Sequence, residues 1–131
     1  MLDESKVVIY YLIPIDNEFG VQMGIYTPKI FDECYSADIC HAERKAATQK
    51  ALYERVLHEA AIRRQKVVGE VIACEDNDTT ARDGWRKVVE VALANKAGCI
   101  MVWNSWHVVA GKVPFRKARE ALEMLGIRLI G

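Results

Sequence analysis

The chain has 131 residues, of which 51% are hydrophobic and 27% are charged, and its formal net charge is zero. These values predict a single globular domain that is long enough to bury a hydrophobic core without disulfides or metals. No apolar run approaches the roughly 20 residues that a transmembrane helix needs. The acidic start at residues 1–6 does not fit a secretion signal. We therefore expect a cytoplasmic protein that does not enter a membrane.

Charge is unevenly distributed along the chain. Residues 1–40 carry seven acidic and two basic side chains, whereas residues 41–66 carry seven basic and three acidic ones. A basic segment of this kind can contact a phosphate backbone, and Arg63 and Arg64 are its candidate DNA-binding residues. The other interpretation is a solvated helix face, on which such charges are common.

The first predicted element is a strand over residues 6–13, a continuous β-branched and aromatic run that ends at Pro14. Such a run is typical of a strand that is buried on both faces. Residues 17–40 then mix Pro, Gly, Asp and aromatic residues without periodicity. We interpret them as an insertion, with a short hairpin near residues 20–26 as one option.

Helices and strands alternate in the rest of the chain. The pattern predicts helices over residues 41–64, 83–97 and 114–125, and strands over residues 66–73, 99–103 and 127–130. Gly98 and Gly126 are expected to end the second and third helices. The apolar stripe of the first helix is predicted to comprise Ala47, Ala51, Tyr53, Leu57, Ala60 and Ala61.

This alternation predicts an α/β fold with three layers, in which a mostly parallel sheet carries helices on both faces. Sites in such sheets form at the carboxyl ends of the strands. Three loops follow those ends, at residues 13–16, 74–82 and 104–110. Any chemistry is therefore expected among these loops.

The three loops carry few catalytic groups. They have neither a glycine-rich phosphate loop nor a Gly-x-Ser-x-Gly elbow. One alternative is a small enzyme, with or without a divalent metal, in which His107 acts as a general base. Its other candidate residues are acidic and basic side chains of the same loops: Asp16, Asp76, Asp78 and Arg82. Cys34, Cys40 and His41 lack the paired spacing of a zinc site. We expect neither a metal nor a cofactor.

The order and spacing of the three loops resemble those of the catalytic domain of serine recombinases, the resolvase and invertase family. In that family the first strand runs through Tyr-x-Arg-x-Ser, an acidic loop ends in Arg-x-Gly-Leu, and a later loop reads Asp-Arg-Leu-x-Arg. Here the corresponding segments are residues 10–14, 75–85 and 106–110. The resemblance covers the first strand and residues 43–131, and is interrupted by the insertion at 17–40.

The resemblance implies attack on a DNA phosphodiester by a serine, with arginines stabilising the charged transition state. This chain departs from the pattern at nearly every catalytic position. Pro14 stands at the nucleophile and Leu12 at the preceding arginine. Only Arg82 is retained, and it joins Arg63 and Arg64 as a candidate DNA-binding residue. In the later loop the Asp, Arg and Arg of the family are replaced by Trp106, His107 and Ala110. Recombinase catalysis by this mechanism is therefore not expected.

The resulting hypothesis is a resolvase-like module, related to site-specific DNA recombination, that acts by binding or regulation. DNA, an active recombinase and a second copy of the chain are all open as partners. We expect residues 1–131 to form one domain without an accompanying DNA-binding domain. The insertion contains four aromatic residues, Phe19, Tyr26, Phe31 and Tyr35. They are candidates for an interaction surface, and the alternative is that they pack over an edge of the sheet.

Overall fold

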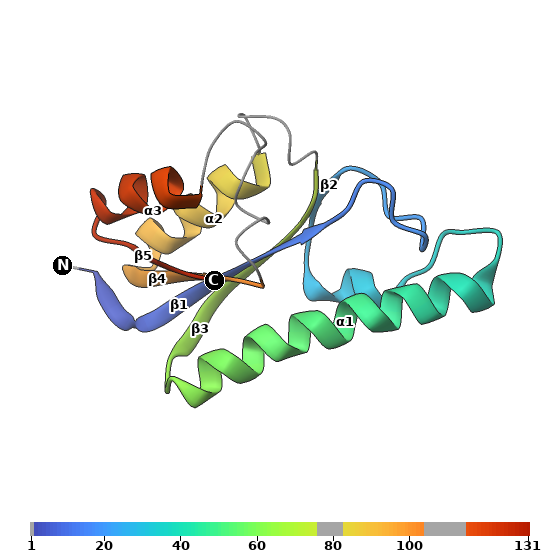
Figure 1. Cartoon of the computed structure of the whole chain (residues 1–131), viewed down its shortest axis with the longest axis horizontal. Helices are drawn as coiled ribbons and strands as arrows, with labels where there is room; N and C mark the ends of the chain where they lie inside the picture. The colour runs from blue at the N-terminus through green and yellow to red at the C-terminus, as the bar shows by residue number, and fades with distance from the viewer. Residues whose placement is uncertain (1, 76–82, 104–114) are drawn as a thin grey trace.

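The fold is a three-layer α/β arrangement around a five-stranded, mostly parallel sheet (Figure 1). A computed structural model describes residues 2–75, 83–103 and 115–131. The strands are β1 (Asp3–Ile13), β2 (Gly24–Tyr26), β3 (Lys66–Cys74), β4 (Ala97–Val102) and β5 (Arg128–Ile130). The helices are α1 (Ile39–Ile62), α2 (Asp83–Ala94) and α3 (Phe115–Glu123), with a 3-10 turn η1 (Pro28–Asp32).

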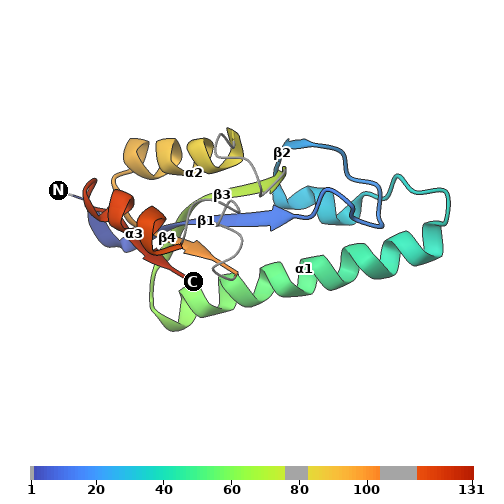
Figure 2. The same cartoon turned by 45° about the horizontal axis from the view of Figure 1, so that its top comes forward.

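The sheet order is β2-β3-β1-β4-β5. β1 pairs in parallel with β3 and β4, and β4 pairs in parallel with β5, whereas β2 is antiparallel to β3. Helix α1 covers one face of the sheet together with η1, and α2 and α3 cover the other (Figure 2). The predicted fold class, a three-layer and mostly parallel α/β fold, is confirmed.

Strand β1 supplies both halves of the core, as its uninterrupted apolar run predicts. Its alternate residues Val7, Ile9, Tyr11 and Ile13 face the cluster under α1. Val8, Tyr10 and Leu12 face the cluster under α2 and α3. Each of these seven residues is at most 2% exposed, which is the burial expected of a central parallel strand.

The predicted stripe on the first helix is wrong for three of its alanines. Ala47, Ala51 and Ala61 are exposed, and the buried residues of α1 are Ala42, Ala46, Tyr53, Val56 and Ala60. Alanine is small enough to be accepted on either face, so alanine positions carry little information about which face is buried. The helix begins two residues earlier than predicted, after Asp38, whose side chain accepts a hydrogen bond from the His41 amide at 3.1 Å.

Gly98 does not cap a helix, contrary to the prediction. It lies inside β4, where a Cβ would come within 2.8 Å of the backbone of Asp3 and Glu4. The turn after α2 is made by Lys96, with φ at 55°. Gly126 does follow α3 with φ at 81°, as predicted.

The insertion forms β2 and η1. β2 pairs antiparallel with the edge strand β3, and not with a neighbouring strand of a short hairpin near residues 20–26. Phe19 and Phe31 are buried, and Phe31 packs edge-on against Tyr11 with ring centres 5.7 Å apart. Tyr26 is partly buried, and only Tyr35 is largely exposed. Most of these aromatic residues therefore pack the insertion against the hydrophobic core.

Candidate functional site

The carboxyl ends of β1, β3 and β4 lie side by side in the sheet, as the sequence predicts. The structure describes the loop after β1, Glu75 after β3 and Trp103 after β4. Six predicted site residues lie outside the described residues: Asp76, Asp78, Arg82, Trp106, His107 and Ala110. Asp16 is exposed in the first loop, so the acidic and histidine alternative stays a prediction.

The end of β1 carries no nucleophile. Leu12 is buried in the core against α2 and α3, and Pro14 occupies the position just beyond the strand. Asn17 closes the loop: its Nδ2 donates to the Pro14 carbonyl at 3.0 Å and to the Val21 carbonyl at 2.7 Å. Its Oδ1 accepts the Val21 amide at 2.7 Å. These bonds fold the loop back on itself without presenting a reactive group.

Cys74 is the nucleophile type nearest to this loop, and it is unsuited to attack. It is buried at the end of β3, and its thiol donates to the Pro14 and Val21 carbonyls at 3.7 Å each. Burial raises the pKa of the Cys74 thiol, so the reactive thiolate is disfavoured. Cys74 therefore packs in the core and donates weak hydrogen bonds, and its environment does not favour a nucleophilic thiolate.

The N-terminus of α2 already holds an anion that belongs to the chain itself. One carboxylate oxygen of Glu75 accepts the Gly84 amide at 2.8 Å, and the other accepts the Tyr10 hydroxyl at 2.7 Å. In α/β proteins this place after a strand is where a helix N-terminus binds phosphate. Sequence reasoning missed this role of Glu75, because it depends on the approach of Gly84 to the end of β3, where a Cβ would lie 2.5 Å from the Cβ of Ala73.

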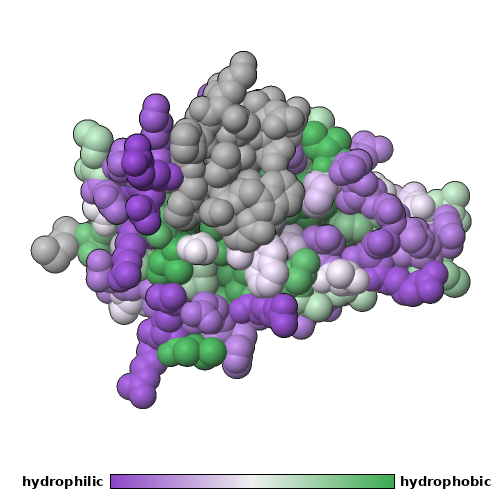
Figure 3. Space-filling model, viewed as in Figure 1, coloured by the Kyte–Doolittle hydropathy of each residue, from purple (hydrophilic) through white to green (hydrophobic). Residues whose placement is uncertain are grey.

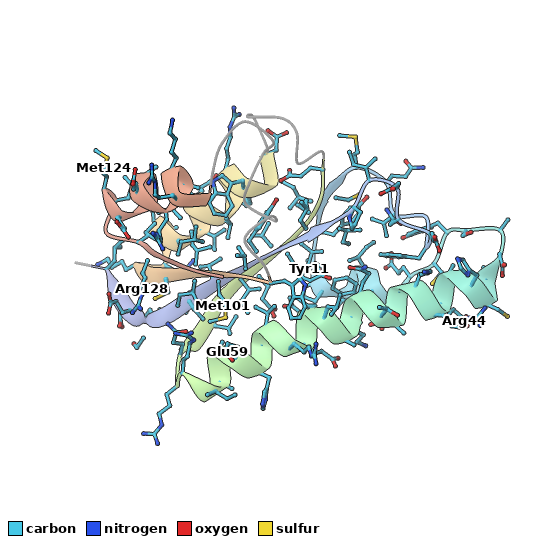
Figure 4. The ribbon with its side chains drawn as sticks, in the orientation of Figure 1. Tyr11, Arg44, Glu59, Met101, Met124 and Arg128 are labelled. Carbon is cyan, nitrogen blue, oxygen red and sulfur yellow. The ribbon has the colours of Figure 1, made fainter. Side chains whose placement is uncertain are left out.

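A groove lies between α1 and the strands β4 and β5, and it is here called the α1–β4 groove. Its cavity measures about 430 Å³, and it is lined among the described residues by Arg55, Val56, His58, Glu59, Arg63, Met101, Val102, Trp103, Ile130 and Gly131. Figure 4 labels Glu59 on α1 and Met101 on β4, which reach this space from the helix and from the sheet. Sequence reasoning did not find this groove, because its residues are far apart in the chain.

Cationic groups predominate on the helix side of the α1–β4 groove. The Arg55 guanidinium lies 5.8 Å from the ring centre of Trp103, within cation–π range. The Arg63 Nε lies 3.2 Å from a carboxylate oxygen of Glu59, one turn earlier. Arg64 follows Arg63 and is exposed, with φ at 57°, and it does not line the groove. The structure thus brings Arg63 and Arg64 to the end of α1, away from the loops that follow β1 and β3.

The residues considered for zinc do not form a site. Cys34 is half-buried, Cys40 is exposed, and His41 Nε2 pairs with Glu18, whose carboxylate lies 3.4 Å from Lys45 Nζ. The hydrogen bonds from His41 and Lys45 hold the pKa of Glu18 below its usual range. Within the described ranges there is no group of three His, Cys, Asp or Glu side chains that could hold a metal.

Comparison with known proteins returned no relative. No family model matches the chain, and neither the curated proteins nor the solved structures contain a match. Among the described residues, no helix is both long and apolar enough to cross a membrane. The fold and geometry therefore define a three-layer α/β protein with a cationic groove beside its sheet.

Proposed function

We propose that this chain is a nucleic-acid-binding module on a resolvase-like scaffold, and that it lacks recombinase catalysis. The observation that carries the proposal is the distribution of charge along α1 and the turn that follows it. A cytoplasmic location fits such a role. An active recombinase or a second copy of the chain remains the other class of partner, and no contact in the described residues favours either over DNA.

The insertion neutralises the N-terminal half of α1. Lys45 Nζ lies 3.4 Å from the Glu18 carboxylate, and Lys50 Nζ lies 2.9 Å from the Asp32 carboxylate. The acidic residues that make residues 1–40 negative are thus partly used within the molecule. A phosphate backbone would have to compete with them at this half of the helix.

The end of α1 and the residues that follow it carry an excess of positive charge. Over residues 54–66 the charged side chains are Arg55, Arg63, Arg64 and Lys66 against Glu54 and Glu59, a net charge of +2, and all six are exposed. Cations here also interact favourably with the carbonyl end of the helix. An exposed cluster of this kind attracts nucleic acid through the phosphates, with little dependence on sequence.

The end of β1 supports the second part of the proposal. Pro14 has no side-chain hydroxyl, and Leu12 is too deeply buried for any replacement there to reach a phosphate without repacking the core. Loss of one donor to a developing oxyanion commonly costs about 100- to 1,000-fold in rate. Loss of both the nucleophile and its neighbouring arginine leaves binding as the remaining activity.

The test is the salt dependence of binding to a DNA duplex. For B-DNA each phosphate contact adds about 0.9 to the slope of log K against log salt concentration. The double variant Arg63→Ala with Arg64→Ala is expected to reduce that slope by about 2, as measured by fluorescence anisotropy.

The matched control is Arg116→Ala with Lys117→Ala. It removes the same charge from α3, on the opposite face of the sheet, where both side chains are exposed. We expect this control to keep the wild-type slope. Equal effects of the two double variants would show that only net charge matters, and would overturn the assignment of the contact to α1.

A further inference from the structure

The α1–β4 groove combines an apolar floor with a cationic side. Its floor is apolar and comes from the sheet, with Met101 of β4 and Ile130 of β5, which belong to the cluster under α1. Its helix side carries Arg55, His58 and Arg63. In Figure 3 hydrophobic residues lie in the middle of the viewed face, below the grey atoms, and hydrophilic residues border them.

Trp103 and Arg55 place two planar groups together at this groove. The guanidinium of Arg55 lies 5.8 Å from the indole centre. Nucleobases stack on the faces of tryptophan rings and on guanidinium planes. The pair can therefore hold a flat heterocycle, and Val56 beside it adds apolar contact.

The remaining cations supply an anion site next to those planar groups. Glu59 pairs with Arg63 and offsets its charge. Arg55 still leaves the helix side of the groove with a net positive charge, even without a contribution from His58. Arginine suits phosphate because its planar fork donates two parallel hydrogen bonds. A purely apolar ligand would leave these cations unused, and a bare anion would leave the apolar floor and Trp103 unused.

We propose that the α1–β4 groove binds a nucleotide, with the base on Trp103 and Arg55 and the phosphate at His58 and Arg63. The cavity of about 430 Å³ lies within the range of small-molecule sites. The ligand is either a free nucleotide or the phosphorylated end of a nucleic-acid strand, which present the same chemistry. The site goes beyond duplex binding at the end of α1, because Arg64 lies outside the groove and a duplex contact needs no cavity.

The test is calorimetric titration of the purified chain with AMP, adenosine, inorganic phosphate and a short 5′-phosphorylated oligodeoxyadenylate. AMP is expected to bind one to one, and more tightly than adenosine or phosphate alone. Arg55→Gln and Trp103→Leu are each expected to weaken AMP binding by about tenfold, through loss of a planar cation or of a stacking face. Arg44→Gln is the matched control, since Arg44 is exposed near the other end of the same helix (Figure 4).

Circular dichroism shows whether Trp103→Leu still folds. Arg55 is exposed, so Arg55→Gln tests the groove even if Trp103→Leu unfolds the chain. Binding of the oligonucleotide alone, weakened by Arg55→Gln, would support the site and identify a strand end as its ligand. The proposal is overturned when neither AMP nor the oligonucleotide binds, or when Arg55→Gln binds AMP as the wild type does. Phosphate binding as tight as that of AMP would also overturn it. Self-association of the chain that Arg55→Gln abolishes, without AMP binding, would overturn the proposal and assign the groove to a second copy.

Discussion

Above about pH 10 the buried phenols of Tyr11 and Tyr53 are together expected to lower the free energy of unfolding by about 2.7 kcal/mol per pH unit, because both resist ionisation. Tyr11 and Tyr53 lie between the sheet and α1, and they are 1% and 3% exposed. The Tyr11 hydroxyl donates to Gln49 Oε1 at 2.6 Å, and the Tyr53 hydroxyl donates to the Glu70 carboxylate. Burial raises the pKa of both phenols well above the usual value, and Glu70 raises that of Tyr53 further.

The sign of the effect follows from which state binds more protons. Both phenols ionise near pH 10 in the unfolded chain, whereas the native state keeps them protonated. Their contribution to stability is complete below pH 10 and is lost as the pH rises toward the native pKa values. Each phenol lowers the free energy of unfolding by about 1.4 kcal/mol per pH unit in that window.

Urea unfolding between pH 9 and 12 measures the slope of stability against pH, and Tyr53→Phe is expected to reduce it by about 1.4 kcal/mol per pH unit. Tyr35→Phe is the control, since Tyr35 is 62% exposed, and the surface hydrogen bond to Glu33 that raises its pKa is expected to affect the slope less than burial does. A slope in Tyr53→Phe equal to that of the wild type would show that Tyr53 ionises freely in the native state. The packing of α1 on the sheet would then be looser than the structure has it.

Gly84→Ala is expected to lower the free energy of unfolding by about 2 kcal/mol, although alanine is normally the better helix former. The added Cβ would lie 2.5 Å from the Cβ of Ala73 and 2.9 Å from a carboxylate oxygen of Glu75. The Cβ of Ala73 is fixed to the backbone of β3, so α2 has to move away from the sheet. That movement lengthens the bond from the Gly84 amide to Glu75 and loosens the cap of the helix.

Gly24→Ala is the matched substitution. Its added Cβ would lie 3.3 Å from the Tyr26 hydroxyl, at the far end of a side chain that can shift. We expect a change of at most about 0.5 kcal/mol for this variant in the same thermal or urea unfolding experiment. Equal stabilities of Gly84→Ala and Gly24→Ala would contradict the close contact of α2 with β3.

Most of the fold could be predicted from the sequence, because the apolar run of β1 and the alternation of elements depend on local pattern. The incorrect predictions concern positions whose structure depends on contacts between residues that are far apart in the chain. Gly98 looks like a helix cap locally, yet it is needed where β4 passes the backbone of Asp3. The buried face of α1 is set by Tyr53 and Val56 against the sheet, and alanine spacing could not indicate it.

The candidate site was less predictable than the fold. The end of β1 lacks a nucleophile, as its residues suggested, but the bonds of Asn17 that close its loop depend on the insertion. The role of Glu75 and the meeting of Arg55 with Trp103 join elements that are distant in the chain. No sequence motif indicates these contacts, so they are found only from the three-dimensional structure.

The most direct test of non-catalytic nucleic-acid binding is the anisotropy of a labelled DNA duplex, recorded with the chain at low salt and again after denaturant is added. We predict a rise at low salt, produced by the exposed cations of residues 55–66, and a complete return to the value of free DNA on denaturation. No rise at low salt would contradict binding. Anisotropy that stays high after denaturation would reveal a covalent protein–DNA link and contradict the loss of catalysis.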